Sequence, residues 1–250
     1  MSRKPLLEDV LRSVDDVDGW MSPDQAEALY DAATACAEGE QIVEIGSFRG
    51  RSTIVLASAA PQGVTVVAID PHAGNDRGPQ EIDGFGEEAQ EDHTVFLANL
   101  AHAGVAERVH HVRATSADAH DDVAGEVAML YIDGAHRYGP ARDDIDQWGA
   151  RVRDGSTMLI HDSFSSIGVT LAIVRELMFG RRFRYVGRRR SLTIYRADLP
   201  SGVRPRVRNA GRQAAQLPWF VRNVLLKIAL TLGLGRAWKL AGKQVPEWPY

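Results

Sequence analysis

Residues 41–52 read Q-I-V-E-I-G-S-F-R-G-R-S, and this stretch decides the fold. The run 41–45 is short and rich in β-branched residues, as in a strand that is covered on both faces. Gly46 and Gly50 would let the backbone turn sharply and pass close to a bound ligand. Ser52–Ala60 follows with helical spacing. We therefore predict a strand, a tight turn and a helix in immediate succession.

Two serines in this turn, Ser47 and Ser52, are candidates to cap the helix. The amides at the start of such a helix favour a negative group, for example a carboxylate. The spacing of the glycines is G-x-x-x-G, which differs from the G-x-G-x-x-G of pyrophosphate-binding loops. Taken alone, the turn also suits an ordinary connection between a strand and a helix.

The alternation of strand and helix continues along the chain. The predicted strands are Gln41–Ile45, Val64–Asp70, Arg108–Arg113, Val127–Asp133 and Thr157–His161. The predicted helices are Ser52–Ala60, Glu87–Ala103, Ala117–Val123, Pro140–Arg151 and Ser166–Phe179. Two further runs, Phe183–Val186 and Leu192–Tyr195, predict a closing antiparallel hairpin. Together these elements predict an α/β fold with a doubly wound, mostly parallel, seven-stranded sheet.

Composition sets limits on the class of protein. The chain has 250 residues, 44% of them hydrophobic and 25% charged, which excludes a disordered, collagen-like or polytopic membrane protein. The single cysteine, Cys36, excludes a disulfide framework and a zinc site built from several thiolates. The charged N-terminus lacks the apolar core of a signal peptide, so we expect a cytoplasmic protein. We expect helices that cap the rim over 1–38, the α/β domain over 39–199 and a tail over 200–250.

The tail differs from the body in charge. The net charge of −4 divides into about +8 over 201–250 and about −12 over the rest. The acidic body argues against a nucleic-acid partner, whereas the tail would be drawn to an anionic surface.

The tail is also apolar. Seven residues recur at helical spacing, namely Leu217, Phe220, Val221, Val224, Leu225, Ile228 and Leu232, with Arg222 and Lys227 off this row. The charges argue against a membrane-spanning helix. Trp219 and Trp238 flank the segment, as aromatic residues do at a membrane interface. Two interpretations stay open: peripheral contact of 217–240 with the inner face of the cell membrane, or a helix that docks on its own domain or on a second copy in a homo-oligomer.

Polar residues follow the second and third predicted strands. Asp70 could accept hydrogen bonds from both hydroxyls of a ribose, or act as an ordinary turn aspartate. Ser116 or Asp118 could meet the edge of an adenine, although both are also good residues for a helix start.

Three motifs together resemble the class I S-adenosylmethionine-dependent methyltransferases. They are E-I-G-S-F-R-G-R-S at 44–52, Asp70-Pro71 and Y-I-D-G-A-H at 131–136. The resemblance covers roughly residues 40–196 and points to the branch of bacterial sugar O-methyltransferases of the macrolide type. It implies a Rossmann-like methyltransferase fold over 39–199. It also implies that S-adenosylmethionine is bound by Glu44, Gly46, Ser47, Gly50, Ser52, Asp70, Ser116, Asp118 and Asp133, with Glu44, Gly46 and Ser47 around its methionyl end.

The fourth and fifth predicted strands end in chemically active residues. Asp133 and Asp162 would lie close together, because neighbouring parallel strands are about 5 Å apart. Carboxylates at that distance repel each other, and a shared proton or a divalent cation relieves the repulsion. With His161 as the third ligand, the set suits Mg²⁺ or Mn²⁺. Such a cation would hold the acceptor hydroxyl and lower its pKa.

His136 is our candidate for the catalytic base, with Asp133 beside it. In the sugar-methylating relatives, a D-x-x-H pattern supplies a metal-binding aspartate and the catalytic histidine, and an acidic pair follows the fifth strand. Here that pair is His161-Asp162, which departs from the pattern. His161 is left open as a ligand, a second base or a residue bonded to the backbone. The alternative for His136 is a loop histidine that caps the next helix.

Three further features carry weaker expectations. The glycine-rich segment His72–Gly86 is expected to close over the acceptor as a lid, with His72 and Asp76 as acceptor contacts; the alternative is a surface loop. Asp143, Asp144 and Asp146 are expected on a solvated helix surface. The arginines of the final hairpin suit an anionic acceptor or a charged sheet edge.

These observations favour an O-methyltransferase that acts on a sugar, glycan or glycolipid hydroxyl. A catechol or phenol acceptor is the near alternative. A nicotinamide dehydrogenase would share the fold, but its phosphate-loop spacing and a Tyr-x-x-x-Lys pair are missing. The remaining alternative is a non-catalytic, membrane-tethered nucleotide-binding module.

Overall fold

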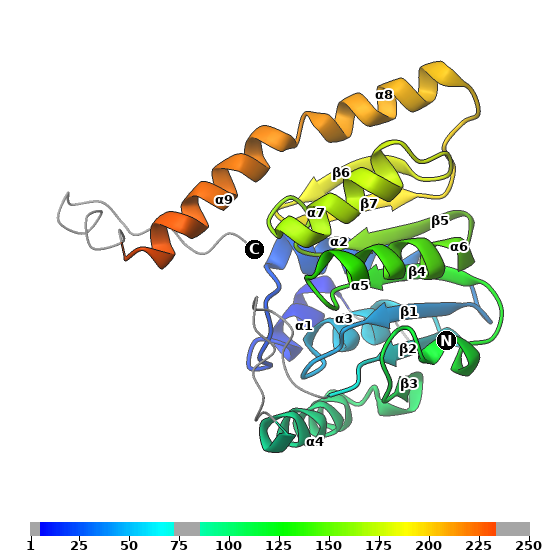
Figure 1. Ribbon diagram of the computed structural model, residues 1–250. Coiled ribbons are helices and arrows are strands. Elements are labelled where there is room, and N and C mark those ends of the chain that lie inside the picture. The colour runs from blue at the N-terminus through cyan, green and yellow to red at the C-terminus, as the bar shows by residue number, and fades with distance from the viewer. Residues whose placement is uncertain (1–5, 73–85, 234–250) are drawn as a thin grey trace.

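A mixed sheet with the strand order β3-β2-β1-β4-β5-β7-β6 forms the centre of the molecule (Figure 1). The computed structural model describes residues 6–72 and 86–233. The strands are β1 (Gln41–Ile45), β2 (Thr65–Ile69), β3 (Val109–Val112), β4 (Val127–Ile132), β5 (Val152–Ile160), β6 (Arg184–Arg189) and β7 (Leu192–Arg196). Strands β1 to β5 pair in parallel, and β7 runs antiparallel to both β5 and β6. The predicted doubly wound fold with a closing hairpin is confirmed.

Alternating side chains of the strands serve two apolar cores. Ile42 and Met129 face a core with helices α1 (Leu7–Ser13), α2 (Pro23–Thr34), α3 (Arg51–Ala59) and α4 (Gly86–His102). Val43 and Leu130 face the other core, which contains residues from α5 (Tyr138–Asp143), η3 (Asp144–Trp148) and α7 (Ile167–Ile173). Both faces are therefore buried, which explains why these strands are apolar runs.

Three predicted helices differ from the structure. In place of Ala117–Val123 there is only a short 3₁₀ turn, η2 (Ala119–Asp122). The stretch 140–151 contains α5, the π-helical turn η3 and α6 (Gly149–Arg151). The stretch 166–179 contains α7 and a second π-helical turn, η4 (Val174–Met178). A π-helical turn inserts one residue into a helix and shifts the faces that follow, and sequence periodicity does not reveal it. A further 3₁₀ turn, η1 (Ala106–Arg108), precedes β3.

The sheet register brings several strand ends level. Ile45 is paired with Ile69 of β2 and with Ile132 of β4. The amide of Gly46 donates to the carbonyl of Ile69, and the amide of Asp133 donates to the carbonyl of Ile45, both at 2.8 Å. The residues that follow β1, β2 and β4 therefore meet at one edge of the sheet.

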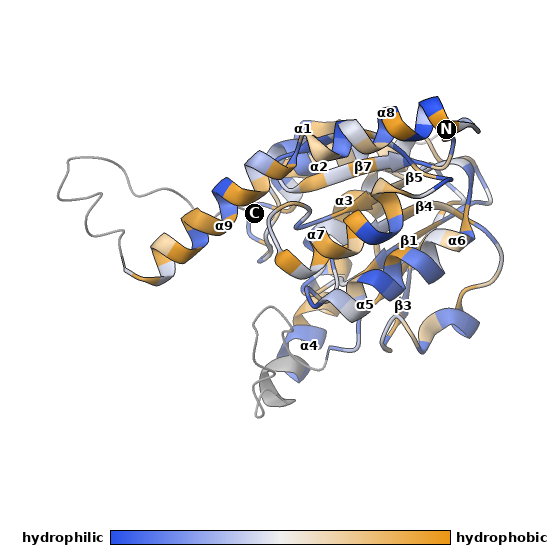
Figure 2. Cartoon of the chain, turned by 45° about the horizontal axis from the view of Figure 1, so that its top comes forward, coloured by the Kyte–Doolittle hydropathy of each residue, from blue (hydrophilic) through white to orange (hydrophobic). Residues whose placement is uncertain are grey.

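The end of the described chain forms an arm of two helices, α8 (Val203–Ala214) and α9 (Leu217–Thr231). In both views α9 extends away from the body (Figures 1 and 2). Within the described ranges, no helix is both long and apolar enough to cross a membrane.

Candidate active site

The loop after β1 can form only because residue 46 is glycine. Gly46 has φ of +88°, and a Cβ built on it would lie 2.3 Å from the carbonyl oxygen of Asp133. The loop therefore lies directly against the end of β4. Gly50, also at φ +88°, is the N-cap of α3, and no side chain caps this helix. The expected capping by Ser47 or Ser52 is wrong.

The two serines have other positions. The hydroxyl of Ser52 donates to Glu44 at 2.5 Å. The hydroxyl of Ser47 is buried and has no hydrogen-bond partner among the described residues. A buried hydroxyl without a partner is costly, and a bound ligand could satisfy it.

Glu44 supports this loop from beneath. Its side chain is fully buried, and its second oxygen accepts a hydrogen bond from Thr53 at 2.5 Å. Burial raises the pKa of Glu44 to about 8, although the two hydroxyl groups oppose the shift. Through these two hydrogen bonds Glu44 ties β1 to the first turn of α3. Its expected place at the methionyl end of the cofactor stays a prediction.

Asp70 lies at the same edge and orders the backbone around it. One carboxylate oxygen accepts the amide of Phe48 and the other accepts the amide of His72, both at 2.8 Å. Each oxygen keeps a second lone pair for a ligand. The predicted contact of Asp70 with a ribose stays a prediction.

The loop after β3 is held by the carboxylate of Asp144, a residue that the sequence predicted at the solvated surface. The hydroxyl of Ser116 donates to Asp144 at 2.5 Å, and Asp144 is buried. Burial raises the pKa of Asp144 to about 6. Trp148 donates to the carbonyl of Ser116 at 3.0 Å. Asp118 is exposed and accepts a hydrogen bond from Thr115 at 2.6 Å.

A sequence pattern could have indicated the burial of Asp144. Ala141, Ile145 and Trp148 are all buried, and they lie at helical spacing on the face that Asp144 shares.

Asp133, His136 and Asp162 form a cluster at the ends of β4 and β5. One ligand atom from each lies within 4.8 Å of the others. Nε2 of His136 is 2.9 Å from Oδ2 of Asp162. Oδ2 of Asp133 accepts a hydrogen bond from the hydroxyl of Tyr131 at 3.0 Å. The sequence did not indicate this contact. The predicted meeting of these two strand ends is confirmed.

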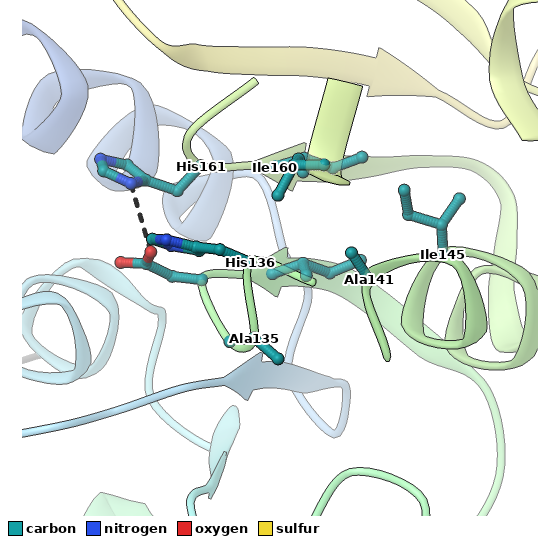
Figure 3. Close-up of a pocket in the computed structure, with 10 residues that line it drawn as sticks. Ala135, His136, Ala141, Ile145, Ile160 and His161 are labelled. Atoms are coloured by element: carbon teal, nitrogen blue, oxygen red, sulfur yellow. Dashed lines mark ion pairs between the residues drawn. The ribbon is translucent and has the colours of Figure 1, made fainter. Parts of the chain in front are cut away.

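His161 contacts both carboxylates. Figure 3 draws its ring beside that of His136, with a dashed line to one of the two carboxylates. Its Nδ1 is 3.2 Å from Oδ1 of Asp133 and 3.3 Å from Oδ2 of Asp162, and its side chain is only 1% exposed. Burial alone would lower the pKa of His161, but the two carboxylates outweigh it and raise the pKa to about 10. The same contacts hold the pKa of Asp162 well below its usual range. The two carboxylates therefore favour the protonated ring, which argues against a second base.

The cluster fits a divalent cation in its choice of donors. Oδ1 of Asp133 and Nε2 of His136 are buried, and neither makes a hydrogen bond of normal geometry with a described residue. Two carboxylates and one imidazole that converge without being saturated are suitable ligands for Mg²⁺ or Mn²⁺. His161 contacts the same carboxylate oxygens from the side and lies outside the trio. The converging trio thus contains His136 where we predicted His161, and the metal set of Asp133, His161 and Asp162 stays a prediction.

Apolar side chains form the remaining wall of the pocket around this cluster. They include Ile145 of η3 and Ile160 of β5, which line the same pocket as His136 and His161 (Figure 3). Such a wall limits the access of water from beneath and strengthens the electrostatic interactions within the cluster.

Two weaker expectations are corrected. His72 is buried and its ring packs 5.1 Å from that of His111 and 5.3 Å from that of Phe96, so it does not face an acceptor. Arg184 of the hairpin pairs with Asp198 at 2.7 Å, and Arg188 lies 3.9 Å over the ring of Trp219. These two arginines therefore have structural partners. The predicted lid beyond His72, with Asp76, lies outside the described residues.

Comparison with known proteins agrees with this geometry. A family described as a methyltransferase domain matches residues 43–163. The cofactor-bound Rv0187 from MTB is 22% identical, with a TM-score of 0.51 over 76% of this chain and 88% of that one. A SAM-dependent O-methyltransferase from Thermotoga maritima is 15% identical, with a TM-score of 0.54 over 80% and 74% of the two chains. The O-methyltransferase NovP is 16% identical, with a TM-score of 0.55 over 71% and 81%.

At these identities the solved structures show a shared fold, and the family match covers the segment that contains the loop after β1, Asp70 and the cluster. Residues 43–163 therefore resemble a methyltransferase domain, and the chain has the Rossmann-like fold of these solved structures.

Proposed function

We propose that this protein transfers the methyl group of S-adenosylmethionine to a hydroxyl of a sugar or glycan. The observation that carries the proposal is the contact between the loop after β1 and the end of β4, where Gly46 lies against the carbonyl of Asp133. A ligand on that loop would lie beside the cluster of Asp133, His136 and Asp162.

The cofactor contacts are supported by unsatisfied or available polar groups. The buried hydroxyl of Ser47 needs a partner, and the first amides of α3 favour the carboxylate of an amino acid. Asp70 has free lone pairs for a ribose, and Ser116 is fixed at the end of β3, on the side expected for the adenine.

We propose that His136 is the base that accepts the proton of the acceptor hydroxyl. The hydroxyl oxygen attacks the methyl carbon in line with sulfur, the carbon–sulfur bond breaks, and its electron pair stays on sulfur as S-adenosylhomocysteine is released. The hydroxyl proton passes to the imidazole of His136, which has the carboxylate of Asp162 beside it, with Nε2 and Oδ2 2.9 Å apart. His161 offsets the charge of Asp133 and Asp162, which otherwise repel each other across the site.

Asp133, Asp162 and His136 would also hold a divalent cation, which would bind the acceptor oxygen and lower the pKa of its hydroxyl. If His136 is a ligand, it cannot accept the proton at the same nitrogen. Activity with and without EDTA separates these two roles.

The sugar acceptor rests on the resemblance of Y-I-D-G-A-H at 131–136 to the sugar-methylating branch. A test is the transfer of label from methyl-labelled S-adenosylmethionine to a panel of sugars, glycolipids and catechols. Calorimetry should show binding of S-adenosylhomocysteine but not of NAD, and Asp70→Ala should weaken that binding. Labelling of catechols alone would overturn the sugar acceptor, and binding of NAD alone would overturn the methyltransferase.

A further inference from the structure

One face of α9 is fixed to the active-site loop. The amide nitrogen of Asn223 donates to the carbonyl of Phe164 at 3.1 Å, and the ammonium of Lys227 donates to the carbonyl of Ser165 at 3.0 Å. Both carbonyls follow Asp162 within three residues. The position of α9 is therefore coupled to the loop that carries a member of the cluster.

The opposite face of α9 exposes a row of large apolar side chains. Val221, Leu225, Ile228 and Leu232 are 53%, 61%, 50% and 70% exposed. At 100° per residue they share one side of the helix, opposite the buried Asn223. We call these four residues the apolar row. Figure 2 shows this helix leaving the body with hydrophobic residues along it.

Two further exposed apolar side chains lie on α7, which follows the loop of Asp162. Ile167 and Leu171 of α7 are 58% and 52% exposed, and Ile167 lies two residues beyond Ser165, which contacts Lys227. An exposed apolar surface of this extent is typical of a docking site.

The arm carries positive charge only. Between residues 199 and 233 there are six basic residues and no acidic residue. Arg204, Arg208 and Arg212 form an exposed set along α8 at a spacing of four residues, and Arg222 flanks the apolar row. None of these four arginines forms an ion pair with a described residue. An anionic partner would offset this charge.

We propose that the arm binds the surface of an anionic lipid bilayer and that the acceptor is a glycan carried by a lipid. The apolar row would enter the boundary between headgroups and acyl chains, and the arginines would meet lipid phosphates. In this placement α9 lies between the bilayer and the loop of Asp162, which is then about one helix diameter, roughly 10 Å, from the membrane surface. A second copy is the weaker occupant, because a two-fold contact would bring the same arginines together. The lipid-carried acceptor rests on the function proposed above.

The test is flotation of the full-length protein with phosphatidylcholine vesicles, with and without phosphatidylglycerol. We expect binding only to the anionic vesicles, and weaker binding as salt rises. The double variant Leu225→Gln with Ile228→Gln should lower the partition coefficient at least about tenfold, because it replaces two apolar side chains that would insert into the bilayer with polar ones. Leu97→Gln, which changes an exposed leucine of α4, is the matched control. Two outcomes would overturn the docking surface. One is equal binding of all variants to the vesicles. The other is a wild-type dimer that dissociates in the double variant but not in Leu97→Gln.

The acceptor has a separate test. The wild-type protein should methylate a sugar on a lipid in anionic vesicles at least about tenfold faster than the same sugar in solution, and the double variant should lose this preference. Equal rates would overturn the lipid-carried acceptor. Calorimetry with S-adenosylhomocysteine, without lipid, tests the proposed function independently. Flotation without cofactor binding refutes the methyltransferase alone, and cofactor binding without flotation refutes the docking surface alone.

Discussion

At the scale of single residues, Gly46 decides whether the loop after β1 can meet the end of β4. Gly46→Ala would place a Cβ 2.3 Å from a backbone oxygen at a positive φ. We expect a loss of at least about 2 kcal/mol in the free energy of unfolding, measured in urea, together with a loss of cofactor affinity. Gly139→Ala is the control, since no atom lies within 4 Å of its Cβ position. Equal stability of the two variants would contradict the close approach.

His136 is the residue on which the proposed chemistry depends. His136→Ala should lower kcat by about 10²–10⁴-fold, because the acceptor loses its base, while the affinity for S-adenosylhomocysteine stays the same. The control is His102→Ala at the exposed end of α4. If EDTA abolishes activity and Mg²⁺ restores it, the reaction needs a divalent cation, and a higher Mg²⁺ requirement of His136→Ala would make His136 one of its ligands. Full activity in EDTA assigns the histidine to proton transfer, and full activity of His136→Ala would exclude both roles.

At the scale of elements, the π-helical turn η3 joins the loop after β3 to the helix after β4. Asp144→Ala would leave the hydroxyl of Ser116 without its acceptor. We expect a loss of about 1–3 kcal/mol in the free energy of unfolding and weaker binding of S-adenosylhomocysteine. Asp146→Ala changes an exposed aspartate of the same turn and should alter neither quantity. Should both variants behave alike, the turn would have no part in positioning the loop.

At the scale of the whole molecule, three histidines from separate elements form a cluster whose charge state depends on folding. The rings of His72, His93 and His111 lie 5.1–5.2 Å from one another. Burial and the neighbouring histidines lower the pKa of His111 to about 4, and burial lowers the pKa of His72 and of His93.

Because the unfolded chain takes up these protons near pH 6.5, the folded state should lose stability as the pH falls from about 6.5 toward 4. The measurement is the free energy of unfolding in urea across this pH range. His111→Phe should give a shallower slope, whereas His110→Phe, at the exposed neighbour on β3, should keep the wild-type slope. A wild-type stability that does not change over this range would contradict the buried, neutral cluster.

The sequence by itself determined the alternation of strands and helices and the chemical character of the strand ends. Runs such as Val127–Ile132 combine residues that favour strands with the apolar character that burial on both faces of a parallel sheet requires. The same logic predicted that Asp133 and Asp162 would meet, since the ends of adjacent parallel strands share one edge.

Only the tertiary structure decided which groups touch. The burial of Glu44 and Asp144, the contacts of His161 with two carboxylates and the meeting of Asp133, His136 and Asp162 all depend on contacts between distant segments. A one-residue shift at a π-helical turn changes which side chain faces inward, and no local pattern records it. Charge state follows the same rule, because the pKa of His161 is set by two aspartates that meet it only in the folded sheet.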